Sequence, residues 1–128
     1  ETLLAPTTIY VKPLLQLLAE QPVHALAHIT GGGLPENLPR VLPPGAQAII
    51  ERGRWTQPPV FDWLASAGNI EDAELLRTFN CGVGMVAVMP ASAIEPARKL
   101  LADHGVESWD IGEIVAAPSD DAPAVRIV

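Results

Sequence analysis

Val23-His-Ala-Leu-Ala-His-Ile-Thr-Gly-Gly-Gly33 follows a proline and ends in three consecutive glycines. Alternation over 23–30 places Val, Ala, Ala and Ile on one face and both histidines, Leu and Thr on the other, which predicts a β-strand. The Ala and Leu residues would also suit a helix, but the short length and the flanking proline and glycines favour the strand. We therefore expect a strand over 23–30 that runs into a glycine loop.

Helices and strands are expected to interleave on both sides of this segment. Apolar residues at helical spacing predict a helix over 13–20. The most apolar run, Val83–Met89, predicts a central strand, and Ser92 is the expected N-cap of a helix that reaches Asp103. The other expected elements are helices over 59–67 and 70–77, at most a short helix over 34–39, and strands over 46–51, 108–117 and 124–128. With a pair of strands at the end, this order predicts an α+β fold in which a mixed β-sheet is packed with helices.

Composition narrows the class of protein. The 128 residues are 48% hydrophobic and carry a formal net charge of −7, which indicates one folded domain and disfavours binding to nucleic acid. A single cysteine, Cys81, excludes an internal disulfide and fits a reducing, cytoplasmic setting. No stretch is apolar for long enough to predict a membrane span, and the first residues lack the pattern of a signal peptide. The chain opens without Met, so we expect a piece of a longer protein.

The histidines and glycines of the opening segment are the first candidates for a site. On a strand, His24 and His28 lie about 13 Å apart, too far to share a metal ion, so no metal site is expected. His28 stands near the strand end, where ligands gather in α/β sheets. The three glycines would let backbone N–H groups approach an anion, or else form a tight structural bend. Glu36 would oppose an anion there, unless Arg40 offsets its charge or Glu36 faces an N–H-rich part of a ligand.

A second polar and glycine-rich cluster precedes the most apolar strand, over 78–84. Cys81 has no nearby His or Lys in the sequence, so an inert buried thiol is expected rather than a nucleophile. Asn80 either faces a ligand or satisfies its own backbone in a turn. The three tryptophans are expected in the core. From the residues alone, the chain is an acidic domain with a candidate small-ligand site between two glycine-rich turns.

Three stretches of the chain resemble the AIR synthetase (phosphoribosylformylglycinamidine cyclo-ligase) family. They are Pro6-Thr-Thr-Ile-Tyr-Val-Lys12, His24-Ala-Leu-Ala-His-Ile-Thr-Gly-Gly-Gly33 continuing as Pro35-Glu-Asn-Leu-Pro-Arg-Val-Leu-Pro43, and Arg77-Thr-Phe-Asn-Cys-Gly-Val-Gly-Met85. Their order and spacing match, and the likeness spans nearly the whole chain. The resemblance covers only the C-terminal part of the family's proteins. It implies that residues 1–128 are an N-terminally incomplete C-terminal domain and that the ATP-binding N-terminal domain is absent from the chain.

The resemblance implies an enzyme of purine biosynthesis. Members use ATP and Mg²⁺ to activate the formyl oxygen of formylglycinamidine ribonucleotide as a phosphate ester, and an internal nitrogen then closes the ring of aminoimidazole ribonucleotide. ATP and Mg²⁺ would be bound mainly by the N-terminal domain, which also supplies most of the homodimer contact. The 128-residue chain alone is therefore expected to be inactive.

The same resemblance carries a set of residues to the substrate cleft, with no general base among them and no metal ligand. The implied substrate-binding residues are His28, Thr30, Gly31, Gly32, Gly33, Glu36, Asn37, Arg40 and Asn80. In this assignment the glycine loop holds a phosphate, Arg40 neutralises anionic charge, and the two asparagines orient amide groups. The alternatives are a non-catalytic interaction module and a related ATP-dependent synthetase of the same superfamily.

Overall fold

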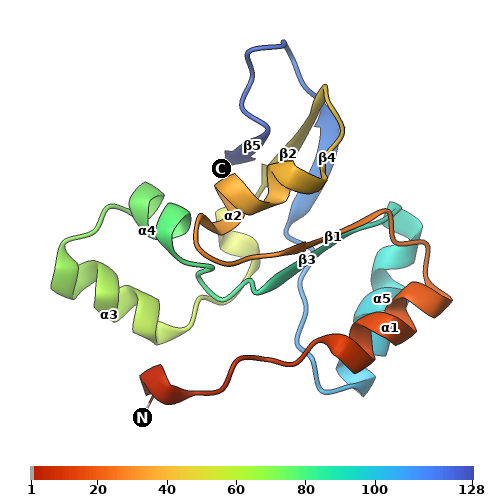
Figure 1. Ribbon diagram of the computed structural model, residues 1–128, viewed down its shortest axis with the longest axis horizontal. Coiled ribbons are helices and arrows are strands. Elements are labelled where there is room, and N and C mark those ends of the chain that lie inside the picture. The colour runs from red at the N-terminus through yellow and green to blue at the C-terminus, as the bar shows by residue number, and fades with distance from the viewer. Residues whose placement is uncertain (1) are drawn as a thin grey trace.

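Helices and strands alternate along the chain in the expected order in the computed structural model, which describes residues 2–128 (Figure 1). The helices are α1 Val11–Glu20, α2 Gly33–Asn37, α3 Pro59–Gly68, α4 Asp72–Thr78 and α5 Ile94–Asp103. The strands are β1 Ala25–His28, β2 Ala46–Ile50, β3 Met85–Val88, β4 Gly112–Ala116 and β5 Val125–Ile127. Short 3₁₀ turns lie at Thr2–Leu4, Leu38–Val41, Arg52–Arg54 and Ala91–Ala93. The α+β class is thereby confirmed.

The strands form two sheets. β1 and β3 pair antiparallel, with His28 opposite Met85, and β2 lies between β4 and β5 in a three-stranded sheet. That second sheet is mixed, because β2 is antiparallel to β4 and parallel to β5. The last two strands therefore do not pair with each other as expected. The central strand is β2, in which Gln47, Ala48 and Ile50 are buried.

The expectation of a central strand over Val83–Met89 is wrong, because β3 pairs only with β1 among the described residues. Its apolar character has another cause, which is packing on both faces. Val86 packs against the larger of two clusters of buried residues, which is the main core, whereas Ala87 and Met89 pack against the smaller cluster, built from α1 and α5. A strand covered on both faces has an apolar sequence even where it has only one neighbour.

Two local predictions about α5 have opposite outcomes. Ser92 is not the N-cap, because a 3₁₀ turn in which Ala93 N–H donates to Pro90 O precedes the helix and places Ala93 at the cap position. Gly105 does end the helix, with a φ of +72° and Val106 N–H donating to Leu101 O. This is the left-handed turn that glycine adopts most readily after a helix.

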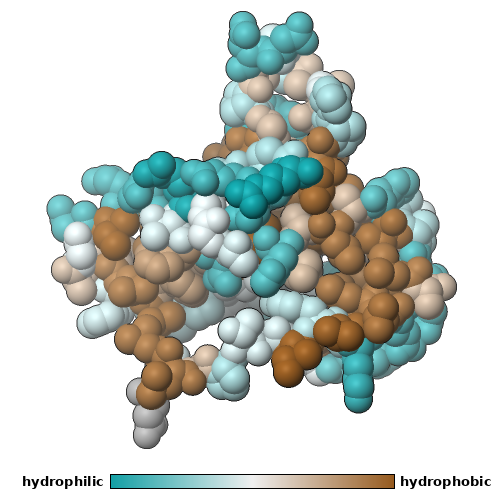
Figure 2. All heavy atoms as spheres, viewed as in Figure 1, coloured by the Kyte–Doolittle hydropathy of each residue, from teal (hydrophilic) through white to brown (hydrophobic). Residues whose placement is uncertain are grey.

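The core has two parts. The larger cluster fills the space between the sheets and α2, α3 and α4, and includes Ile29, Leu34, Leu38, Leu75 and Cys81. The smaller cluster joins α1 to α5 through Leu17, Ala97 and Leu100. Outside these clusters, apolar side chains gather on the surface over α1 and α5 (Figure 2), where Val11, Leu15 and Leu18 are exposed.

The tryptophans are only partly where they were expected. Trp55 is buried and Trp109 packs against the main core, but Trp63 is 59% exposed. The reason is its helical position: Phe61 and Ala65 turn the inner face of α3 toward the core, and Trp63 between them points outward. None of the helices among residues 2–128 is both long and apolar enough to cross a bilayer.

Candidate functional site

The three glycines between β1 and α2 meet three different structural demands. Gly33 has a φ of +57°, and a Cβ there would overlap the Leu76 carbonyl of α4. Gly32 has a φ of +98°, and a Cβ there would lie 2.8 Å from Glu36 Cβ. Gly31 has neither constraint, because no atom would lie within 4 Å of its Cβ and its φ is not positive. The fold thus explains the second and third glycines, whereas the absence of a side chain at Gly31 has no structural cause.

Asn37 holds the loop from inside. Its side chain is buried, and its amide group donates to Gly33 O at 2.8 Å, Gly31 O at 3.2 Å and Thr30 O at 3.4 Å. Its Oδ1 accepts from the Thr30 hydroxyl at 3.4 Å. The loop carbonyls are therefore directed toward Asn37. Gly33 N–H donates to Thr30 O, whereas the N–H groups of Gly31 and Gly32 form no hydrogen bond with other described residues.

Exposed polar side chains surround this loop. His28, Thr30, Glu36 and Arg40 are all exposed, while Asn37 is buried. The Glu36 carboxylate lies over Gly32, with Oε2 2.8 Å from the position of a Cβ on that glycine. Arg40 follows on a 3₁₀ turn and forms no ion pair with any described residue, Glu36 included. The Glu36 carboxylate therefore lies beside the loop, and neither it nor Arg40 forms an ion pair among the described residues.

The second glycine-rich turn lies next to the first. The Phe79 carbonyl would be 2.9 Å from a Cβ on Gly33, and Ile29 N–H donates to Gly84 O at 2.9 Å. Within the turn, Asn80 Oδ1 accepts from Gly82 N–H at 3.0 Å. The structure therefore brings together the two turns that the sequence singled out. The Asn80 side chain is used inside its own turn, which was the alternative to a ligand contact.

Cys81 has the environment of a structural thiol. Its side chain is fully buried, and Sγ lies 3.6 Å from the Leu75 carbonyl. Burial raises the pKa of the Cys81 thiol above its ordinary value. Trp55 covers the same segment, since its indole N–H donates to Cys81 O at 3.0 Å. A neutral, buried thiol is not a nucleophile, in agreement with the sequence-based expectation.

Tyr10 also lies near this site, although it belongs to neither of the two glycine-rich clusters. Its ring meets the His28 ring edge-on, with centroids 6.4 Å apart and an interplanar angle of 69°. It comes from the residue just before α1, far from β1 in the sequence. The sequence feature that could have indicated Tyr10 is its position in the first of the three stretches that resemble the family.

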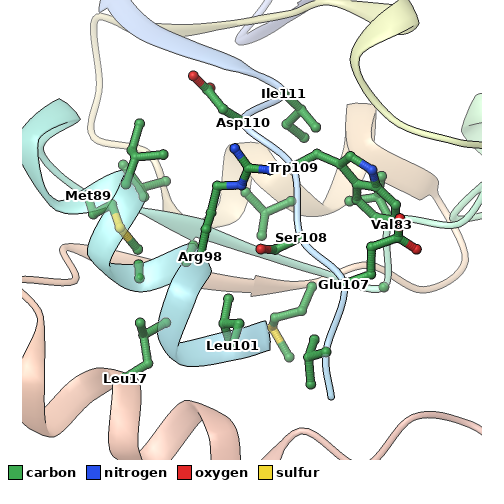
Figure 3. Close-up of a pocket in the computed structure, with 18 of the residues that line it drawn as sticks. Leu17, Val83, Met89, Arg98, Leu101, Glu107, Ser108, Trp109, Asp110 and Ile111 are labelled. Carbon is green, nitrogen blue, oxygen red and sulfur yellow. The ribbon is translucent and has the colours of Figure 1, made fainter. Parts of the chain in front are cut away.

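A cavity of about 630 Å³ lies beside the site and not within it. It is bounded by β3, α5 and the segment 105–114, and its walls are largely apolar (Figure 3). Leu17, Met89, Leu101, Trp109 and Ile111 are among the side chains labelled there. None of the nine predicted site residues lines this cavity, although Tyr10 and Gly84 do.

The described residues contain no group of three His, Cys, Asp or Glu side chains that could hold a metal ion. His24 lies just before β1 and His28 is the last residue of that strand, and both side chains are exposed.

Comparison with known proteins relates the chain to a protein family and to a curated relative. A family model described as "AIR synthase related protein, C-terminal domain" matches residues 1–123. A protein of Nitrosococcus oceani named phosphoribosylformylglycinamidine cyclo-ligase is 58% identical over 120 residues, which make up 94% of this chain. The matched region is 34% of that relative, so the chain spans about a third of its length.

Proposed function

Because this chain belongs to the AIR synthase-related family, whose C-terminal domain it matches over 1–123, we propose that it is the C-terminal part of an ATP-dependent phosphoribosylformylglycinamidine cyclo-ligase. The observation that carries the proposal is the identity of 58% over nearly all of the chain with a relative of that name. The reaction would convert formylglycinamidine ribonucleotide and ATP into aminoimidazole ribonucleotide, ADP and phosphate. As proposed, residues 1–128 supply one wall of the substrate cleft.

The geometry supports a division of roles among the predicted site residues. His28, Thr30, Gly31, Glu36 and Arg40 are exposed at the loop, where a small anionic substrate could reach them. We assign Arg40 to the substrate phosphate, since it is a cation without an ion-pair partner among the described residues. Gly31 would contact the substrate through its backbone, which explains why it carries no side chain.

The remaining predicted residues act inside the protein. Gly32 and Gly33 provide the backbone conformation and the close approach to α4, and Asn37 fixes the loop carbonyls. Asn80 stabilises the neighbouring turn through Gly82 N–H. We therefore propose that these four residues shape the cleft and that the exposed ones bind the substrate.

ATP and Mg²⁺ would be bound by an N-terminal domain that is not part of this chain. The residues described here do not fit a metal ion, because no three potential metal ligands gather among them. ATP would supply the phosphoryl group that activates the formyl oxygen. As the family resemblance suggests, we place the homodimer contact in that domain and the complete enzyme in the cytoplasm, with its small-molecule substrates as partners.

A chimera tests this proposal. The matching third of the Nitrosococcus relative is replaced by this chain, and ADP release is measured with ATP, Mg²⁺ and formylglycinamidine ribonucleotide. We expect substrate-dependent ADP release from the chimera, and none from this chain alone or from the relative without its matching third. A folded chimera without turnover would contradict the cyclo-ligase assignment and favour a non-catalytic module. Turnover by the 128-residue chain alone would contradict the need for a separate ATP-binding domain.

A further inference from the structure

The Tyr10 ring occupies a position that links three segments. Its backbone carbonyl accepts from Leu14 N–H at 3.0 Å, so the residue marks the first turn of α1. Its half-buried ring extends from there to the end of β1 and meets His28 edge-on. An edge-to-face contact of this kind favours one relative orientation of the two rings.

Gly84 provides the space for this ring. A Cβ on Gly84 would collide with the Tyr10 hydroxyl and lie 3.2 Å from its Cζ. The φ of Gly84 is not positive, so its backbone conformation does not itself require glycine. Gly84 also accepts a hydrogen bond from Ile29 N–H, which keeps it next to the end of β1. The missing side chain at Gly84 is therefore explained by the Tyr10 ring.

His24 shows what the contact adds. It is an exposed residue just before β1, four residues before His28, and no aromatic ring contacts it among the described residues. An exposed side chain on a strand samples several rotamers, and ordering it on substrate binding costs conformational entropy. Because the Tyr10 contact already restricts the His28 ring, less conformational entropy would be lost when the substrate binds.

We propose that Tyr10 is a positioning residue that orients the His28 imidazole at the glycine loop for substrate binding, and that Gly84 lacks a side chain to admit the Tyr10 ring. This inference rests on the proposed function, because it assigns a role in binding the cyclo-ligase substrate. Tyr10 itself acts through His28 and does not contact the substrate.

Nuclear magnetic resonance of the 128-residue chain tests the orientation directly. The imidazole protons of His28 should show a ring-current shift that the protons of His24 lack. Tyr10→Phe should retain this shift, because it keeps the ring, whereas Tyr10→Leu and Gly84→Ala should both abolish it. Thermal melts of each variant check that the fold is retained. An unchanged His28 signal in Tyr10→Leu would overturn the proposal.

The chimera then tests the role in binding through a double-mutant cycle. Tyr10→Leu should raise the KM for formylglycinamidine ribonucleotide by about 2- to 12-fold, the range expected for loss of one aromatic pair, with little change in kcat. Tyr10→Phe should restore the KM. In a His28→Ala background, Tyr10→Leu should have no further effect.

Phe61→Leu is the matched control, because it removes the other aromatic pair, in which Phe61 and Phe79 lie 5.9 Å apart. It should lower the melting temperature without changing the KM. Additive effects of Tyr10→Leu and His28→Ala would overturn the positioning role while leaving the cyclo-ligase assignment intact. An inactive parent chimera would count against the proposed function instead. The ring-current shift of the His28 protons would still test the Tyr10 contact.

Discussion

Replacing Asn37 by alanine should destabilise the 128-residue chain more than its small volume suggests. The variant loses the 2.8 Å hydrogen bond to Gly33 O and the two longer bonds to Gly31 O and Thr30 O. Since the side chain is only 5% exposed, water cannot easily replace these bonds. One short buried bond and two longer ones are together worth roughly 2–3 kcal/mol in the free energy of unfolding.

The assay is thermal unfolding followed by circular dichroism, with urea unfolding as a second measurement. For a domain of this size, the expected loss lowers the melting temperature by roughly 6–12 °C. Asn37→Asp is the sharper variant, because it keeps the shape but directs a carboxylate at the same carbonyl oxygens. It should be less stable than Asn37→Ala at pH 7. Equal stability of Asn37→Ala and the parent chain would refute the stabilising role of these hydrogen bonds. An Asp variant more stable than the Ala variant would refute it as well.

Four further predictions follow from single residues. Gly31→Ala should melt like the parent chain yet lower the turnover of the chimera, whereas Gly33→Ala should fail to fold stably, because its Cβ would overlap an α4 carbonyl. Thermal melts and turnover measurements distinguish the two variants, and a fully active Gly31→Ala chimera would contradict the substrate contact. In the chimera, Arg40→Leu should weaken substrate binding by roughly 1.5–3 kcal/mol without lowering the melting temperature. Burial raises the pKa of the Cys81 thiol, so alkylation of Cys81 in the folded chain should be slower than in the chain unfolded by urea. Because the unfolded thiol releases its proton first, stability should fall as the pH rises above about 8.5, but not in Cys81→Ala. Finally, Trp63→Phe should remove most of the acrylamide-quenchable fluorescence, since that indole is 59% exposed.

Element positions could be predicted from the sequence because they depend on local patterns. Alternation located β1, helical spacing located α1, and Gly105 marked the end of α5. Strand partners could not be predicted in the same way. An apolar run such as 83–89 reports how thoroughly its faces are covered, which is the same for a central strand and for β3 between two clusters. Pairing depends on contacts between distant segments, so β2 rather than β3 became central.

The two glycine-rich turns of the candidate site could be found in the sequence, but the directions of their polar side chains could not. Glycine clusters marked both turns, and the structure places them side by side. Whether a polar side chain points outward or inward is a three-dimensional property, and so Asn37, predicted to orient a ligand, has its amide bonded to the loop. Tyr10 was missed for the same reason. Its contact with His28 joins segments that periodicity cannot relate.

The parallel pairing of β2 with β5 has a consequence for synthesis on the ribosome. Ala48 and Ile50 of β2 are buried, but one edge of that strand is completed only by residues 125–127, and Gln47 Nε2 donates to Pro123 O, 76 residues away. At 5–20 residues per second, β2 therefore waits several seconds with an open edge, during which β4 alone can join it. The β1–β3 sheet can form earlier, since β3 emerges before β4 and β5. Nascent chains should thus acquire the glycine loop and its neighbouring turn before the mixed sheet closes.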